Sequence, residues 1–278
     1  MISVLSVNFH SALDLSSLTD SLLQHADGEP FELIVVNNSP VESLELSDAV
    51  RDRTRILNRP NVGYARGVNA AAAEAGGDIL FVANPDVRIT HGALAGAREH
   101  LQRHPDVAVL LPLLKDGNGG TQASVRRFYT WRAAAYARLP LRNRIPDPQF
   151  FREYLMTDQR PSAPAPVDWG LGGAMFLRRD DYPEGRIFDE RFFLYFEDVD
   201  LCLRVWQSGR TVVYHPGIVC EHRHRRASAR TFSRAGLHHL GGLVKFIFKH
   251  HGLPQRPKPR HLPRSEAQRS AASRANDS

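Results

Sequence analysis

The chain lacks several features that would mark a secreted, disulfide-bonded or membrane-spanning protein. Only two of its 278 residues are cysteines, Cys202 and Cys220, which is too few for a disulfide framework and does not match any metal-binding spacing. No apolar run approaches the roughly 18 residues that a spanning helix requires. The chain begins with an apolar stretch typical of a strand and has no charged leader. We therefore expect a cytoplasmic protein with reduced thiols.

Two common nucleotide-binding motifs are also missing, and the positive charge is concentrated at one end. Neither GxGxxG nor GxxxxGK[ST] occurs, which argues against dinucleotide-binding and P-loop proteins. The net charge is +6, and residues 251–278 carry six Lys or Arg against two Asp or Glu, or 6 − 2 = +4. The rest of the chain is nearly neutral. This distribution argues against a nucleic-acid-binding protein but allows a local contact with an anionic surface.

The first 110 residues alternate between strand and helix patterns. The chain is 42% hydrophobic, which is enough for a sizeable core in one large or two small domains. The expected strands are residues 2–8, 31–36, 55–58, 79–83 and 107–111, and the expected helices are residues 15–23, 67–75 and 93–103. Strands that alternate with helices predict an α/β fold, with right-handed βαβ units and a parallel sheet covered on both faces.

Short polar side chains follow three of these strands. Asn8 ends the first, Asn37 and Asn38 follow the second, and Asn84-Pro85-Asp86 follows the fourth. Ligands of open α/β sheets bind outside the carboxyl ends of the strands, so we expect these residues to line one crevice. The alternative for each of them is ordinary turn chemistry, because short amides and carboxylates also favour turns.

The segment 61–69, Asn-Val-Gly-Tyr-Ala-Arg-Gly-Val-Asn, lies before the second expected helix. Gly63 and Gly67 permit a close backbone approach, and Arg66 places a cation near a helix N-terminus. This arrangement suits a phosphate or a nucleotide base. A plain structural turn is the alternative.

Residues 115–166 differ from the rest of the chain, because prolines, arginines and aromatic residues are interleaved there. The segment is either a solvated insertion with a small core of its own or a flap over a ligand site. In the second case its aromatic faces would stack on sugar rings or lie at a lipid interface, on the side of the molecule that receives a transferred group. Trp169 follows beside Gly170, Gly172 and Gly173, where it could form a sugar-binding platform or simply pack in the core. Residues 175–177 are expected to form a strand.

The most informative stretch is residues 192–204, where aromatic residues lead directly into carboxylates and a helix. Val199, Cys202, Leu203 and Trp206 share one helical face, and Ser208-Gly209 can end that helix. Asp198, held against apolar surface at the helix start, suits a general base. The structural alternative is an Asp198 N-cap, with Asp200 and Arg204 as a surface ion pair.

The C-terminal third contains one more strand, a histidine and a basic end. Residues 211–214 predict a strand, and His222 lies near the end of the apolar stretch that follows. We divide the chain into residues 1–114, a nucleotide-sugar half; 115–166, the insertion or flap; 167–231, a catalytic half; 232–252, an amphipathic helix; and 253–278, a disordered basic tail. The helix carries Leu237, Leu240, Leu243, Val244 and Ile247 at helical spacing.

Taken together, these motifs resemble the inverting family 2 glycosyltransferases, particularly bacterial rhamnosyltransferase-like enzymes. The resemblance covers roughly residues 1–224. It rests on residues 7–9, 35–39, 61–69, 84–86, 173–174 and 188–204. It implies a GT-A fold with a mainly parallel nucleotide-binding sheet, a nucleotide-sugar donor and a divalent cation, Mn²⁺ or Mg²⁺.

The resemblance also implies roles for individual residues. Asp198 matches the catalytic base, with Glu197 as the alternate, while Asp86 and His222 match metal ligands. Asn84 stands where such enzymes carry the first acid of an Asp-x-Asp motif, and Asn37 where many carry an acid that reads a pyrimidine base. The residues expected at the donor are Asn8, Asn37, Asn38, Arg66, Asn69 and Asn84. Those expected at the acceptor are Trp169, Gly173 and Glu197.

The sequence therefore predicts a cytoplasmic, metal-dependent, inverting glycosyltransferase that uses dTDP-rhamnose and acts on a glycan or lipid-linked acceptor in cell-surface polysaccharide synthesis. A donor such as a UDP-hexose or UDP-galactofuranose is the alternative within this class. The C-terminal helix and tail are expected to contact the inner membrane face peripherally. A rival from another class is a non-catalytic basic module that binds membrane or polyanion.

Overall fold

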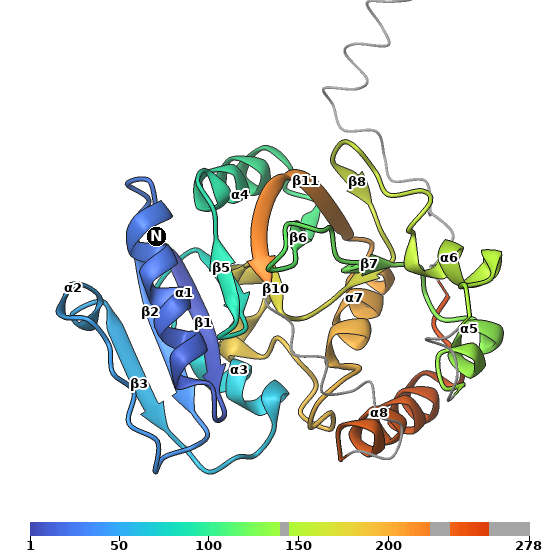
Figure 1. The fold of residues 1–278 in the computed structure, drawn as a ribbon, viewed down its shortest axis with the longest axis horizontal. Coiled ribbons are helices and arrows are strands. Elements are labelled where there is room, and N and C mark those ends of the chain that lie inside the picture. The colour runs from blue at the N-terminus through green and yellow to red at the C-terminus, as the bar shows by residue number, and fades with distance from the viewer. Residues whose placement is uncertain (140–144, 223–233, 256–278) are drawn as a thin grey trace, which may run out of the picture.

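A mixed sheet forms the centre of the molecule (Figure 1). The structure is a computed structural model, and it describes residues 1–139, 145–222 and 234–255. Within these ranges the sheet has nine strands in the order β3-β2-β1-β4-β10-β6-β11-β5, and β8 pairs with β11. The strands are β1 Ile2–Asn8, β2 Phe31–Asn37, β3 Thr54–Asn58, β4 Ile79–Ala83, β5 Val87–Ile89, β6 Val107–Lys115, β8 Ala165–Pro166, β10 Ala174–Arg178 and β11 Thr211–His222. A small second sheet pairs β7 Val125–Arg126 with β9 Trp169–Gly170.

The expected parallel sheet is confirmed for one half of the molecule, and the other half is mixed: β6 and β11 pair in parallel, while β5, β8 and β10 run antiparallel to their neighbours. Strands β3, β2, β1 and β4 run parallel, as the alternating pattern predicts. Strand β10 comes much later in the chain and inserts antiparallel between β4 and β6. Because β10 follows the Gly172-Gly173 turn directly, this insertion places that turn at the carboxyl end of β4.

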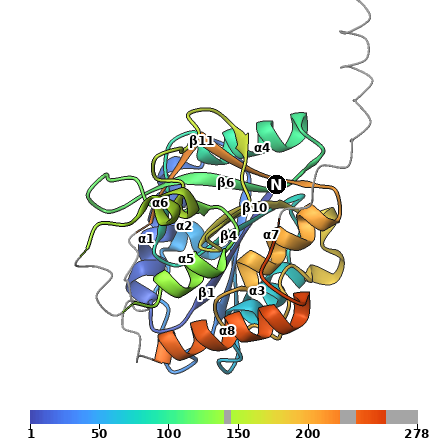
Figure 2. The ribbon, with the colours of Figure 1, turned by 90° about the vertical axis from the view of Figure 1, so that its right-hand side faces the viewer.

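Helices cover both faces of the sheet (Figures 1 and 2). The helices are α1 Ala12–His25, α2 Asp48–Arg51, α3 Tyr64–Ala73, α4 Ala93–Arg103, α5 Trp131–Tyr136, α6 Gln149–Leu155, α7 Glu197–Gln207 and α8 Arg234–His250. Alternate side chains of each central strand point to opposite faces. Val4 of β1 therefore joins the core beneath α1 and α4, while Leu5 joins the core shared with α3, α7 and α8.

The start of α3 depends on one glycine. Gly63 has φ +103°, and a Cβ there would lie 2.6 Å from the carbonyl oxygen of Phe193. The same oxygen accepts a hydrogen bond from the Tyr64 backbone N–H at 2.7 Å. Both a left-handed backbone and the absence of a side chain are therefore required here, and the N-terminus of α3 is held against the aromatic loop that leads into α7.

The C-terminal helix α8 packs beside that loop and α7 (Figures 1 and 2). Leu243 and Phe246 are buried, and Ile247 is partly buried against the same core. The sequence pattern places Leu240 and Val244 on the buried face of this helix, but both are exposed. Phe246 takes their place on the buried face. Of the basic tail, residues 256–278 lie outside the described residues. Within the described ranges, no helix has the length and apolar character needed to cross a membrane.

Candidate active site

A strained turn brings two carboxylates into the interior at the start of α7. Tyr195 and Phe196 have φ values of +69° and +71°, the left-handed region that large side chains rarely adopt. Such residues cost on the order of 1–3 kcal/mol each, and they persist only where the surrounding contacts hold them. Glu197 and Asp198 follow this turn, and both are buried.

Asp198 is fixed by backbone donors on both of its oxygens. Its Oδ2 accepts from the Gly172 N–H at 3.1 Å, and its Oδ1 accepts from the Val199 N–H at 2.8 Å. The Tyr64 hydroxyl donates to the Gly172 carbonyl at 2.9 Å. Gly172 is therefore held from both sides, and a Cβ on it would lie only 3.3 Å from the Asp198 Cβ.

Burial separates the charge states of the two neighbouring carboxyls. Burial raises the pKa of Asp198, but the Gly172 and Val199 N–H groups and the Arg126 cation oppose that shift. Burial and the charge of Asp198 raise the pKa of Glu197 well above its usual range. Its Oε2 has no hydrogen-bond partner among the described residues. The negative charge is therefore held better by Asp198, which makes it the carboxylate of the pair that is ionised and able to accept a proton.

A second pair of acceptors lies where β4 and β11 end. Asp86 follows β4, and because Val87 is the register partner of His222, the Asp86 Oδ1 comes within 3.3 Å of the His222 Nε2. Gln122 fixes the histidine ring, since its Nε2 donates to the His222 carbonyl and its Oε1 faces Nδ1 at 3.0 Å. This assigns the ring proton to Nδ1 and turns the lone pair of Nε2 toward Asp86.

Gly173 links this pair to Asp198. Its carbonyl accepts from the Asn84 N–H at 2.8 Å. A Cβ on Gly173 would lie 3.0 Å from the Asn84 Nδ2 and 3.4 Å from the His222 Nε2. The neighbouring residue, Gly172, binds Asp198, so Asp198 and the Asp86–His222 pair adjoin the same two-glycine turn.

A row of amides closes the carboxyl edge of the first three strands. The Asn8 Nδ2 donates to the Asn37 Oδ1 at 3.0 Å, and the Asn37 Nδ2 donates to the Asn58 Oδ1 at 3.0 Å. The predicted convergence of Asn8 and Asn37 is thus present in the structure, but their amides are engaged with each other. Asn38 is also buried, and among the described residues its Oδ1 has no hydrogen-bond partner.

Three other predicted site residues make contacts within the protein. Asn69 is buried and holds the Phe188 backbone, donating to its carbonyl at 2.8 Å and accepting from its N–H at 2.9 Å. Trp169 is buried, and its indole N–H donates to the Arg127 carbonyl. Arg66 is half-exposed and lies 3.4 Å from the Glu190 carboxylate. Asn69 and Trp169 thus shape the surroundings of the site from within the core.

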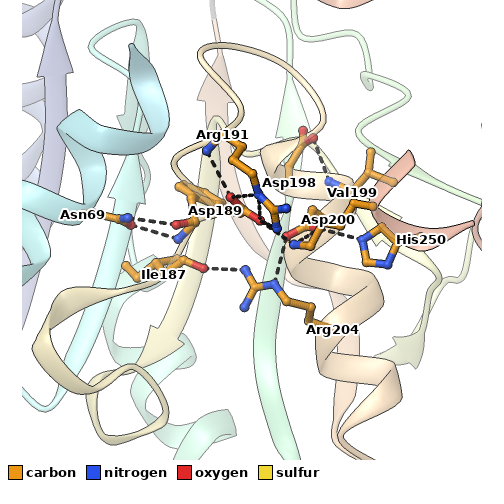
Figure 3. A network of polar contacts seen from close by, with 11 residues as sticks. Asn69, Ile187, Asp189, Arg191, Asp198, Val199, Asp200, Arg204 and His250 are labelled. Carbon is orange, nitrogen blue, oxygen red and sulfur yellow. Dashed lines mark hydrogen bonds and ion pairs between the residues drawn. The ribbon is translucent and has the colours of Figure 1, made fainter. Parts of the chain in front are cut away.

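A buried ionic network anchors α7 two residues beyond Asp198 (Figure 3). Asp200 is fully buried and accepts from the Arg204 Nε at 2.9 Å, the Lys249 Nζ at 2.5 Å and the His250 Nε2 at 2.7 Å. Lys249 also donates to Asp189 at 2.6 Å. The surface ion pair expected from the spacing of Asp200 and Arg204 instead has a fully buried carboxylate, because α8 covers Asp200, while the Arg204 side chain stays 35% exposed. This network ties α8 to the helix that carries Asp198.

Four residues of the site were not found by sequence reasoning. Tyr64 stood inside a recognised motif without an assigned role, and Gly172 was noted only as a neighbour of Trp169. Arg126, whose charge acts on Asp198, was one of many arginines in the insertion. Gln122 has no local signal, because its partner His222 is 100 residues away in the chain.

The raised pKa of Glu197 predicts a pH-dependent stability. A carboxyl whose pKa is higher in the folded state contributes most below its unfolded pKa, and that contribution is lost as the pH rises through the folded pKa. Gln cannot ionise, so Glu197→Gln should need more denaturant to unfold than the wild type at neutral pH. The difference should vanish below about pH 4. Glu45→Gln, at an exposed position, is the control. Identical denaturation midpoints for Glu197→Gln and wild type at neutral pH would contradict this assignment.

Comparison with known sequences identifies the chain's relatives. Residues 3–176 match the family model described as Glycosyl transferase family 2. The chain is 28% identical over 252 residues to the N-acetylglucosaminyl-diphospho-decaprenol L-rhamnosyltransferase of Mycobacterium tuberculosis, covering 84% of this chain and 80% of that protein. It is 25% identical over 242 residues to the rhamnosyltransferase WbbL of Escherichia coli K12, covering 84% and 88%.

Solved structures share the fold at low sequence identity. The structure of GalNAc-T7 with UDP, GalNAc and Mn²⁺ matches with a TM-score of 0.63 and 15% identity over 89% of this chain, which spans 47% of that protein. A mannosyltransferase from Pyrobaculum calidifontis with GDP-Man and Mn²⁺ matches with a TM-score of 0.57 and 15% identity, covering 93% of this chain and 66% of that one. The chain has the GT-A fold and belongs to glycosyl transferase family 2.

Proposed function

We propose that this glycosyltransferase is an inverting, metal-dependent enzyme that moves rhamnose from dTDP-rhamnose to a glycan or lipid-linked acceptor. One observation carries the proposal: a buried carboxylate, Asp198, lies across the Gly172-Gly173 turn from the facing acceptor atoms of Asp86 and His222. The two rhamnosyltransferase relatives support the choice of sugar. A UDP-hexose or UDP-galactofuranose donor is the alternative. A non-catalytic basic module leaves the buried carboxylates without a role.

In this proposal, Asp198 acts as the general base. It takes the proton from an acceptor hydroxyl while that oxygen forms a bond to the anomeric carbon of the donor. The bond from that carbon to the diphosphate breaks, and the nucleoside diphosphate leaves with the electron pair. A single displacement of this kind inverts the configuration. Glu197, whose raised pKa favours its protonated form, would contact the acceptor. It is the alternate base only in the state in which it, and not Asp198, carries the negative charge of the pair.

The Asp86–His222 pair fits a divalent cation. Two lone pairs that face each other at 3.3 Å repel unless a cation or a proton lies between them, and Gln122 has directed the ring proton to the other nitrogen. A bound Mn²⁺ or Mg²⁺ would offset the negative charge of the leaving diphosphate. No group of three or more potential acidic, His or Cys ligands occurs in the described part of the chain. The remaining ligands would therefore come from the donor phosphates and water.

For the donor, we propose that the buried amides read the nucleotide. The Asn38 Oδ1, which lacks a hydrogen-bond partner within the described ranges, is suited to accept from the imide N–H of a pyrimidine base. Asn8 and Asn37 would position this edge through the amide row. Arg66 would approach a phosphate from the start of α3, and Asn84 would contact the donor beside Gly173.

For the acceptor, we propose that the enzyme works at the cytoplasmic face of a membrane. The name of the mycobacterial relative describes a decaprenol-linked substrate, which supports a lipid-linked acceptor here. Trp169 and residues 115–166 would shape the acceptor side, Trp169 indirectly because it is buried. The C-terminal helix and the basic tail would make the peripheral contact.

The base assignment predicts the behaviour of Asp198→Asn. Asn has nearly the same shape and its single oxygen can still accept one of the two backbone hydrogen bonds, but it cannot take a proton, so turnover should fall by roughly 10²- to 10⁴-fold while donor affinity is kept. Steady-state kinetics and calorimetry with the nucleotide measure the two quantities. Glu197→Gln should cost less turnover, and Asp20→Asn on the surface of α1 should cost none. Near-normal turnover in Asp198→Asn would rule out Asp198 as the base.

The cation proposal predicts weak metal binding alone and tight binding with nucleotide. Because Asn84 stands in place of a carboxylate, the protein supplies few ligands and the donor phosphates must complete the set. Calorimetry with Mn²⁺, in the presence and absence of dTDP or UDP, should show this enhancement. Asp86→Ala should abolish it, His222→Ala should reduce it, and Gln122→Ala should lower the metal affinity by about 10- to 100-fold. An unchanged enhancement in Asp86→Ala would remove Asp86 from the site.

A further inference from the structure

Helix α8 carries an apolar stripe on the side that faces away from the core. Leu237, Leu240, Val244 and Phe248 follow one another at intervals of three or four residues, so they lie on one face of the helix. Their exposed fractions are 65%, 48%, 44% and 78%. Because Leu243 and Phe246 already bury the opposite face, the packing of α8 on the protein does not explain the outer stripe.

The stripe continues into a groove on the neighbouring loops. The groove has a volume of about 690 Å³, and Val244 and Phe248 line it on the α8 side. Val62 and Phe193, both partly exposed, line it on the side of the α3 and α7 loops. The exposed apolar surface is therefore shared by three segments that are far apart in sequence.

Helix α8 contributes cations and no Asp or Glu to this surface. The groove lining holds four cations, Arg66, Arg191, Lys245 and Lys249, and one acid, Glu190. Arg66 lies near Glu190, and Asp189 pairs with both Arg191 and Lys249. Lys245 is exposed and donates to the Arg191 carbonyl, so its charge is available to an external partner. An apolar stripe bordered by cations is the pattern of a helix that lies in the interface of an anionic bilayer.

We propose that the outer face of α8 and this groove form a docking surface for an anionic phospholipid bilayer. The four stripe side chains enter the boundary between headgroups and acyl chains, while Lys245 contacts lipid phosphates. A second copy of the chain fits less well, because helix α8 has no acid that could pair with the Lys245 of a copy in a two-fold contact. An anionic bilayer supplies the missing negative charge.

The docking surface is connected to the catalytic base through one loop. Phe193, in the groove, accepts from the Tyr64 N–H at 2.7 Å, and the Tyr64 hydroxyl holds Gly172, which binds Asp198. An acceptor whose lipid chain stays in the bilayer would thus present its sugar beside Asp198. This last consequence rests on the proposed glycosyl transfer, whereas the docking itself does not.

Vesicle binding by the full chain tests the surface directly. Sedimentation with vesicles of phosphatidylcholine alone, or with about one-third phosphatidylglycerol, compares the wild type with the double variant Leu240→Ser/Phe248→Ser. Both side chains are exposed, so the variant should fold normally. It should lose at least about tenfold in binding to the anionic vesicles. Leu13→Ser, at a position 84% exposed on α1 and apart from α8 (Figure 1), should bind as the wild type does.

A fluorescent label tests whether the stripe itself enters the bilayer. Both native cysteines are buried, so Phe248→Cys can be labelled selectively with an environment-sensitive dye, and Leu13→Cys provides the control. The dye at position 248 should brighten and shift to the blue on anionic vesicles, and the dye at position 13 should not. Equal responses at the two positions would overturn the proposal, as would unchanged vesicle binding by the double variant. Self-association through position 248 without vesicles would also overturn it, in favour of a dimer.

These measurements separate the docking surface from the proposed reaction. Binding is measured without nucleotide, metal or acceptor, so a failure to find rhamnosyl transfer leaves the vesicle result standing. Conversely, Leu240→Ser/Phe248→Ser should act on a water-soluble acceptor analogue as fast as the wild type does. Its transfer to an acceptor in anionic vesicles should fall in parallel with its binding.

Discussion

The Gly172-Gly173 turn is the constraint on which the site depends. Gly172 binds Asp198, the proposed base, and Gly173 lies against Asn84 and His222. A side chain at either position would press on those residues. Because β10 follows the turn and inserts between β4 and β6, the sheet itself holds the two glycines in place. The proposed base and the proposed cation ligands are thereby brought to the same turn.

The neighbouring structure keeps two carboxyls buried against the cost of desolvation. The left-handed residues Tyr195 and Phe196 direct the start of α7 inward, and backbone donors together with Arg126 keep Asp198 the better charged of the pair. Two residues beyond Asp198, Asp200 contacts Lys249 and His250 of α8. The helix proposed to meet the membrane is thus also the helix that braces the segment carrying Asp198, and in the proposed function this would link acceptor delivery to the position of the base.

Much of this arrangement could be predicted from residue patterns, because local signals and strand order carry it. The strands before Asn8, Asn37 and Asn84 and the aromatic approach to Asp198 follow from patterns within short segments. A shared site for Asp86 and His222, which are far apart in the chain, was implied only by the family resemblance. Contacts between distant segments could not be predicted. The antiparallel entry of β10, the clamp of Gln122 on His222 and the burial of Asp200 under Lys249 each depend on residues at least 49 positions apart. Trp169 and Asn69 looked like ligand contacts for the same reason, since their partners could not be seen in the sequence.

The most direct measurement is a comparison of the kinetics of Gly172→Ala and Gly173→Ala with metal and donor varied. Added methyl groups would press on Asp198 in the first variant and on Asn84 and His222 in the second. If the turn positions both groups, Gly172→Ala should mainly lower kcat and leave metal-dependent donor binding intact. Gly173→Ala should mainly weaken that binding. Wild-type kcat and donor affinity in both folded variants would contradict the claim that this turn joins the base to the cation site.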